Sequence, residues 1–133
     1  MVTGDTGKRM AQERTKERGD AAEAQALAHL LRHGLSLVQR NYRVAAGPRL
    51  HGGEVDLILR DADGTLVFVE VRSRSSATHG GAAASIGASK QRRLVFAAMH
   101  YLRRFASPPP CRFDVVAIDG GAVSWLRAAF DAA

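Results

Sequence analysis

Two apolar runs near the middle of the chain flank a short polar cluster. The runs extend from Gly53 to Arg60 and from Leu66 to Arg74, and the cluster between them reads DADGT. Runs rich in Val, Leu, Ile and Phe around such a cluster predict two strands joined as a β-hairpin. Asp56 and Glu70 interrupt these runs, and a strand buries a carboxylate only where a positive or hydrogen-bonding group meets it. The hairpin is therefore the first candidate for a functional site.

The length of the turn decides whether the two acids meet. Strand side chains alternate between the faces of a sheet, so a slip of one residue moves every side chain to the other face. A loop over residues 61–65 pairs Arg60 with Leu66 and places Asp56 directly across from Glu70. A loop one residue shorter points the two carboxylates to opposite faces. We predict the longer loop, because it alone gives the two acids a common role.

Helical periodicity appears on both sides of the hairpin. From Asp20 the sequence AAEAQALAHLLRH predicts a helix that ends at Gly34. A second helix is predicted from Ile86 or Ser89 to Phe105, and three prolines end it. The expected buried positions are Ala26, Leu27, Leu30 and Leu31 in the first helix, and Leu94, Ala97, Ala98, Tyr101, Leu102 and Phe105 in the second.

Three further β-prone segments complete the pattern. They are 37–44, 112–118 and 122–126, the last two joined by a turn at Asp119-Gly120-Gly121. The tail RAAFDAA is a candidate for a final helical turn, and residues 73–85, with His79, are expected to be a flexible loop. Strands and helices in this order predict a single α/β sheet with helices packed on it.

Charge is distributed unevenly along the chain. We expect residues 1–18 to be a flexible basic N-terminal arm and residues 19–133 to form a single domain. The formal net charge is +6, and no acidic residue lies between Glu70 and Asp114. The excess of positive charge suits a polyanionic partner. A solvated helix face is an alternative explanation of the basic residues.

Composition excludes several classes of protein. The single cysteine, Cys111, cannot form an intramolecular disulfide or anchor a cysteine-based zinc site. No apolar run is long enough for a membrane span and no signal peptide is visible, so we expect no membrane association and a cytoplasmic protein. Walker, dinucleotide-binding and GxSxG motifs are absent.

Paired carboxylates beside basic residues favour phosphate chemistry. Two neighbouring carboxylates repel, so one of them protonates or a cation sits between them. Mg²⁺ binds one or two carboxylates together with waters and phosphate oxygens, and Mn²⁺ is an alternative. Glu23 lies four residues before Leu27 and projects near the inner face of the first helix. It is either a third acid of this site or a first-turn acid favoured by the helix dipole.

Several blocks of the sequence resemble known families. Glu23 in a first helix, GGEVDLI with Asp56 and FVEVRSR with Glu70 are similar to the PD-(D/E)XK nuclease signature. The course from Gly19 through NYR, GEVDLI, FVEVRSR, ASKQRRL and RFDVVAI resembles the YraN family of uncharacterised bacterial proteins. This similarity covers nearly everything after residue 18, and its blocks agree in order.

The resemblance implies a fold, a metal site and a class of substrate. The fold is restriction-endonuclease-like, with a central mixed sheet of about five strands flanked by helices, and is related to Holliday-junction resolvases. Asp56 and Glu70 match the metal-binding acids, the carbonyl of Val71 is a further ligand, and Glu23 matches the acid from the first helix. Resolvases act on branched DNA as two-fold dimers, so a homodimer is expected.

One position departs from the nuclease signature. Arg72 stands where the signature has lysine, and arginine stays charged, so it can stabilise a phosphate but cannot act as a base. Lys90 is a candidate to supply the missing amine, with Gln91 beside it as a water or phosphate contact; Lys90 is otherwise an ordinary solvated lysine. The residues expected to contact nucleic acid are Arg72, Arg74, Lys90, Arg92 and Arg93.

Three functions therefore stay open at the level of sequence, the most remote being a protein-interaction subunit whose basic surface meets an acidic partner. The first is a Mg²⁺- or Mn²⁺-dependent endonuclease that hydrolyses structured or branched nucleic acid, DNA rather than RNA. The second is a nucleic-acid-binding module that keeps the nuclease fold without turnover, held through phosphate contacts. The sequence contains no base-reading motif, so we expect recognition of shape and backbone.

Overall fold

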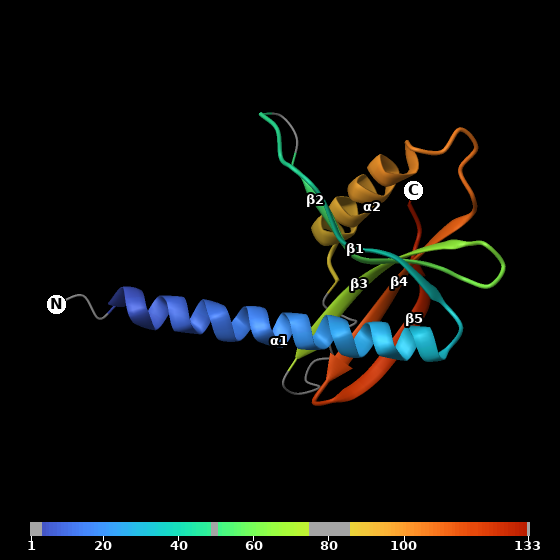
Figure 1. Cartoon of the computed structure of the whole chain (residues 1–133). Coiled ribbons are helices and arrows are strands. Elements are labelled where there is room, and N and C mark those ends of the chain that lie inside the picture. Colours follow the sequence, from blue (N-terminus) through green and yellow to red (C-terminus); the bar gives the residue numbers. More distant parts are fainter. Residues whose placement is uncertain (1–3, 49–50, 75–85, 133) are drawn as a thin grey trace.

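The computed structural model of the chain describes residues 4–48, 51–74 and 86–132 (Figure 1). Of the loop predicted over residues 73–85, residues 75–85 fall outside these residues, whereas Ser73 and Arg74 belong to a strand instead. The described part forms two helices and five strands. In chain order they are α1 (Gly4–Arg32), β1 (Ser36–Val44), β2 (Gly53–Arg60), β3 (Leu66–Arg74), α2 (Ala88–Leu102), β4 (Cys111–Asp119) and β5 (Ala122–Phe130).

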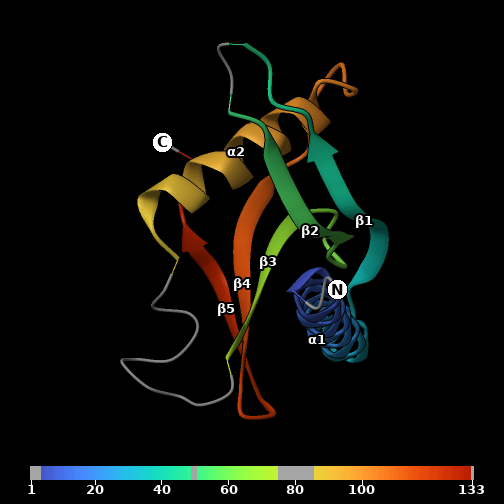
Figure 2. The ribbon, with the colours of Figure 1, turned by 90° about the vertical axis from the view of Figure 1, so that its left-hand side faces the viewer.

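The five strands make one mixed sheet in the order β1-β2-β3-β4-β5. Neighbouring strands are antiparallel except for β3 and β4, which are parallel and are connected through α2. The two helices lie on opposite faces of the sheet (Figure 2). The predicted fold class, α/β with a mixed sheet flanked by helices, is confirmed.

Each helix closes its own hydrophobic core. Ala22, Ala26 and Leu30 of α1 pack against one face of the sheet. Leu94, Ala97, Ala98, Tyr101 and Leu102 of α2 pack against the other. Leu31 was expected in the buried stripe of α1, but it is 46% exposed. The buried stripe follows the spacing 22, 26, 30, which turns Leu31 away from the sheet.

The first helix begins earlier than the sequence predicts. It starts at Gly4 rather than Asp20, so the expected N-terminal arm is continuous with α1 and projects beyond the sheet (Figure 1). Ala, Gln, Glu, Lys and Arg in this segment are good helix formers even where no core lies beneath them. The flexibility of the arm stays a prediction. Neither α1 nor α2 is long and apolar enough to cross a membrane.

The candidate helical turn in the tail is wrong, because β5 continues to Phe130. A register shift between Phe113 and Val115 interrupts the pairing of β4 with β5. Ala128 there adopts a positive φ of 49°, which an alanine rarely adopts in a regular strand. Pairing resumes beyond this bulge, where Phe130 stacks on Phe113 with ring centroids 5.2 Å apart.

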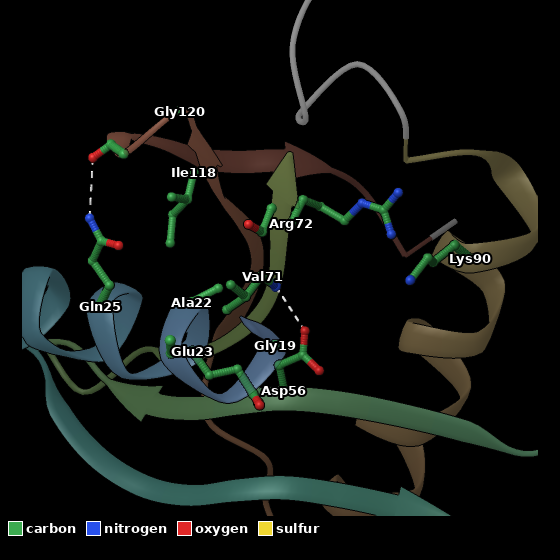
Figure 3. A pocket seen from close by; sticks show the side chains of 13 residues that line it. Gly19, Ala22, Glu23, Gln25, Asp56, Val71, Arg72, Lys90, Ile118 and Gly120 are labelled. Carbon is green, nitrogen blue, oxygen red and sulfur yellow. Dashed lines mark hydrogen bonds between the residues drawn. The ribbon is translucent and has the colours of Figure 1, made fainter. Parts of the chain in front are cut away.

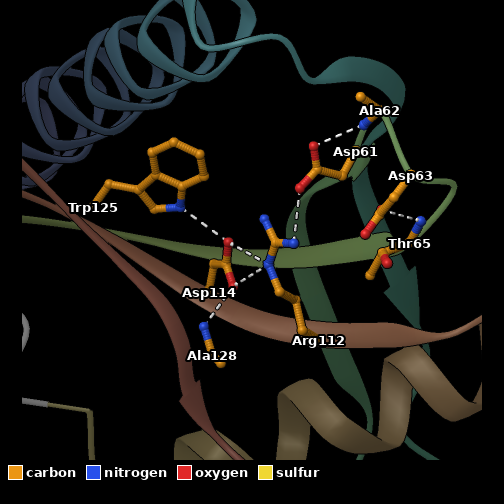
Figure 4. Close-up of polar contacts among 8 residues, drawn as sticks. All are labelled: Asp61, Ala62, Asp63, Thr65, Arg112, Asp114, Trp125 and Ala128. Carbon is orange, nitrogen blue, oxygen red and sulfur yellow. Dashed lines mark hydrogen bonds and ion pairs between the residues drawn. The ribbon is translucent and has the colours of Figure 1, made fainter.

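Asp114 of β4 holds this bulge in place (Figure 4). Its carboxylate is fully buried and accepts hydrogen bonds from Trp125 Nε1 and from the backbone N–H of Ala128, each 2.9 Å long. Arg112 Nε also donates to it at 3.1 Å, and Arg112 Nη1 reaches Asp61 Oδ2 at 2.9 Å. The buried charge is therefore paired, and the network links the β2–β3 turn to β4 and β5.

Candidate functional site

The register of the β2–β3 hairpin brings the two predicted acids together. Arg60 pairs with Leu66 and Leu57 pairs with Val69, as the predicted loop over residues 61–65 requires. Carried one residue further, this register places Asp56 across from Glu70. The regular pairing of the two strands stops at Leu57 and Val69, so the acids lie where β2 and β3 begin to separate.

The Asp56 carboxylate occupies the opening between the strands. Its Oδ2 accepts a hydrogen bond from the backbone N–H of Val71 at 2.8 Å (Figure 3). Burial, and then the negative charge of Glu70, raise the pKa of Asp56 to about 8, against the lowering effect of the Val71 hydrogen bond. Glu23 and Glu54 make smaller contributions in the same direction to this value. The fold thus concentrates negative charge around Asp56 at considerable electrostatic cost.

Glu70 meets a cation from the second helix. Its side chain is buried, with 5% of the residue exposed, and its Oε1 lies 3.1 Å from Lys90 Nζ. Lys90 is in the first turn of α2, and its side chain is 44% exposed. The predicted proximity of the Lys90 amine to the acids is therefore observed, although its role stays a prediction.

Gly53 allows α2 to come this close. A Cβ at Gly53 would collide with the carbonyl oxygen of Arg93 and press on Ala97. Only glycine leaves room for the backbones of β2 and α2 at this point. Since Lys90 lies one turn before Arg93, the close approach also positions its amine.

Glu23 of α1 is the third acid of the group. It is half-buried, and its Oε1 is buried without a hydrogen-bond partner in the part of the chain that is described. Burial raises the pKa of Glu23, and Arg40 acts in the opposite direction. A buried oxygen that lacks a partner is costly, and a cation or an ordered water would satisfy it. Figure 3 shows Glu23 and Asp56 on the same side of one cleft.

These residues fit a hard divalent cation. No group of three or more His, Cys, Asp or Glu side chains is arranged to hold an ion within residues 4–48, 51–74 and 86–132. Mg²⁺, however, needs only one or two protein carboxylates, and waters or phosphate oxygens complete its coordination. Burial and the negative charge of Glu70 disfavour the ionised form of Asp56. A cation bound by the carboxylates of Asp56 and Glu70 would offset both effects.

A cleft of about 840 Å³, lined by Glu23 and Asp56 among others, opens on the α1 side. Arg72 from β3 and Lys90 from α2 extend into it from different walls (Figure 3). Gln25 closes the far end by donating a hydrogen bond from Nε2 to Gly121 O at 3.2 Å. The cleft therefore combines carboxylates that can hold a metal with cations that can hold a phosphate.

A smaller hollow of about 190 Å³ lies against Asp56 and Glu70 on the α2 side. Its lining comprises Glu54, Asp56, Glu70, Lys90 and Arg93. Glu54 was not assigned to the site from the sequence, although it shares a strand face with Asp56. Arg43 of β1 pairs with it, Nε to Oε1, at 3.3 Å.

The other predicted residues differ in how they relate to the acids. Arg92 and Arg93 are exposed on α2. Arg93 also lines the smaller hollow beside Asp56 and Glu70. Gln91 directs its amide Nε2 to the carbonyl oxygen of Ile86 at 3.2 Å and so serves its own helix. Arg74 ends β3, and its side chain lies outside what the structure describes.

Comparison with known proteins places the chain in a family. Residues 22–118 match the family described as "Uncharacterised protein family UPF0102". A UPF0102 protein of Methylibium petroleiphilum is 70% identical over 118 residues, which cover 89% of this chain and 97% of that protein. A UPF0102 protein of Paracidovorax citrulli is 66% identical over 118 residues, covering 89% of this chain and 85% of the relative. One from Cupriavidus pinatubonensis is 58% identical over 117 residues, with 88% and 87% covered.

The chain belongs to the UPF0102 family. The predicted membership of the YraN family, which is the same family, is thereby confirmed. The relation to the restriction-endonuclease-like superfamily stays a prediction.

Proposed function

We propose that this protein is a metal-dependent endonuclease that hydrolyses phosphodiester bonds in structured or branched DNA, in the manner of Holliday-junction resolvases. The observation that carries the proposal is the position of Asp56 and Glu70 one residue beyond the last pair of β2 and β3, with the Lys90 amine 3.1 Å from Glu70 Oε1. Two acids can hold the metal that assists phosphodiester cleavage, and an amine beside them can orient the attacking water.

The four ligand candidates divide into an inner pair and two supporting groups. Asp56 and Glu70 would hold Mg²⁺ or Mn²⁺, with the Val71 carbonyl and Glu23 as further ligands. When bound, the metal would polarise the phosphodiester and lower the pKa of a coordinated water. The N–H of Val71 fixes the orientation of the Asp56 carboxylate.

Lys90 supplies the amine that the strand itself lacks. It is a primary amine beside the Glu70 carboxylate, whereas the guanidinium of Arg72 stays charged and cannot act as a base. Arg72 instead offers a fixed charge to the phosphate as negative charge develops. Lys90 is therefore proposed to orient or deprotonate the attacking water, with Gln91 beside it, and Arg72 to stabilise the phosphate.

The basic start of α2 is proposed to bind the nucleic acid. Lys90, Arg92 and Arg93 follow one another along its first turns, with Arg72 across the cleft and Arg74 further along β3. Contacts of this kind hold phosphates without reading bases, so DNA shape would determine the substrate. A homodimer would present two such centres to a branched DNA.

A cleavage assay tests the proposal. Duplex, flap, splayed-arm and four-way-junction DNA, and an RNA hairpin, are incubated with Mg²⁺ or Mn²⁺ and wild-type protein, Glu70→Gln or Asp56→Asn. We expect cleavage of branched DNA by the wild type, and a loss of at least about 100-fold in each variant. Equal inactivity of the three proteins on every substrate would contradict an endonuclease.

A DNA-binding module without turnover is the second candidate, favoured by Arg72 at the position of the nuclease lysine. It predicts salt-sensitive retention of DNA that is the same with and without metal, and no cleavage. Retention of DNA by both the wild type and Glu70→Gln, together with intact substrate, would select this function.

A further inference from the structure

Three hollows on the described surface follow one another across the carboxylate pair. The cleft and the smaller hollow share Asp56 and Lys90. The smaller hollow shares Glu54 and Arg93 with a third hollow of about 1180 Å³. The three hollows are therefore neighbours that share walls, and the smaller hollow, which Asp56 and Glu70 line, lies between the other two.

This third hollow, the β1–α2 groove, has apolar and basic parts. It lies between the end of β1, the start of β2 and the first half of α2. Its apolar lining comprises Val44, Ala45, Ala46 and Phe96. Its basic lining comprises Arg43, Arg92 and Arg93, with His51 beside them. A purely electrostatic surface for duplex phosphates would not require the apolar part.

Phe96 is the central feature of this groove. Its side chain is half-buried on α2, one turn after Arg92 and Arg93, which are exposed. Arg43 is exposed on β1 and faces the same hollow, where it pairs with Glu54. An aromatic ring flanked by arginines is the combination with which proteins bind single-stranded nucleic acid, the ring stacking on a base and the arginines pairing with phosphates.

We propose that the β1–α2 groove binds unpaired nucleotides of the DNA strand whose phosphodiester lies at Asp56 and Glu70. The proposal rests on the endonuclease function above and narrows its substrate to branched DNA with a single-stranded arm beside the branch, such as a flap. In a duplex the faces of the bases are covered by their neighbours, so the ring and the apolar lining would remain in contact with water. Unpaired bases expose the faces that these groups can bury.

The experiment compares two DNA molecules that differ only in the arm. One is a fluorescent duplex of about 20 base pairs, and the other carries in addition a single-stranded arm of about 10 nucleotides. Binding is measured by fluorescence anisotropy in EDTA, where no cleavage occurs. We expect wild-type protein to bind the armed DNA about tenfold more tightly. Phe96→Leu should remove most of this preference and leave the affinity for the plain duplex nearly unchanged. Arg92→Gln should lower the affinity for both DNAs, because it removes a phosphate contact, and should also remove most of the preference.

The control is Arg103→Gln, which removes the same charge from the other end of α2 and should retain the full preference. Equal wild-type affinity for both DNAs, or full preference in Phe96→Leu, would overturn the proposal. If Phe96→Leu does not fold, Arg92→Gln, a substitution at an exposed position, tests the loss of preference in its place.

A parallel cleavage assay in Mn²⁺ separates this proposal from the proposed function. Preference for the arm without cleavage of any substrate would overturn the endonuclease function and support the groove. Cleavage without preference for the arm would overturn the groove and support the endonuclease.

Discussion

At the scale of single residues, Asp56 carries the largest electrostatic cost of the site. Burial and the nearby Glu70 raise its pKa to about 8, against 3.8 for an ordinary aspartate. The folded protein therefore binds this proton more tightly than the unfolded chain does. It follows that ionisation of Asp56 does not lower the free energy of unfolding below pH 4, and lowers it progressively as the pH rises from 4 to 8.

Replacement of Asp56 by asparagine should stabilise the protein in a pH-dependent way. The amide introduced by Asp56→Asn carries no charge at any pH, and its oxygen can still accept the hydrogen bond from the Val71 N–H. In EDTA, we expect the midpoint of thermal unfolding of this variant to exceed that of the wild type by about 2–8 °C at pH 8.5. The difference should vanish near pH 4. A midpoint equal to or below that of the wild type at pH 8.5 would contradict the electrostatic account.

Lys90 would compete with the proposed metal for Glu70, because its amine lies 3.1 Å from Oε1. Lys90→Met removes that positive charge and retains most of the apolar chain. We expect Mn²⁺ affinity, measured by isothermal titration calorimetry, to rise several-fold, and the cleavage rate to fall by about 100-fold or more. A parallel fall in metal affinity would show that Lys90 supports the site structurally instead.

At the scale of elements, the spacing of β2 and α2 depends on Gly53. Gly53→Ala should lower the free energy of unfolding by about 1–3 kcal/mol, because its Cβ would push against backbone atoms of α2. Urea denaturation measures this. Gly19→Ala is the matched control: no atom lies within 4 Å of a Cβ there, and alanine favours the helix, so stability should rise by about 0.5–1 kcal/mol. Equal effects of the two substitutions would contradict the packing argument.

The hairpin and its acids could be predicted because the information is local. The length of the 61–65 turn fixes the register, and the register fixes the position of Asp56 relative to Glu70. The course of β5 could not be predicted in this way. Its bulge at Ala128 depends on the buried carboxylate of Asp114, which lies on another strand. The contact of Lys90 with Glu70 likewise depends on how α2 packs on the sheet.

At the scale of the whole molecule, the sheet divides the site between its two helices. Glu23 comes from α1 on one face and Lys90 from α2 on the other, and both reach the acids where β2 and β3 separate. The sequence resemblance placed Glu23 in the site, and the position of Lys90 at the start of the basic helix made it a candidate. Glu54 was missed because no motif marks it. The family relationship names no activity, so the functional argument rests on the chemistry of the residues where β2 and β3 separate.

Metal binding at Asp56 and Glu70 tests the central claim most directly. Mn²⁺ is titrated into wild-type protein and into Glu70→Gln by isothermal titration calorimetry near neutral pH, and thermal unfolding is followed over the same concentrations. The account predicts saturable binding and a rise in the unfolding midpoint for the wild type, and a loss of both in Glu70→Gln. Absence of binding to the wild type, or equal binding to both proteins, would contradict a metal site at Asp56 and Glu70.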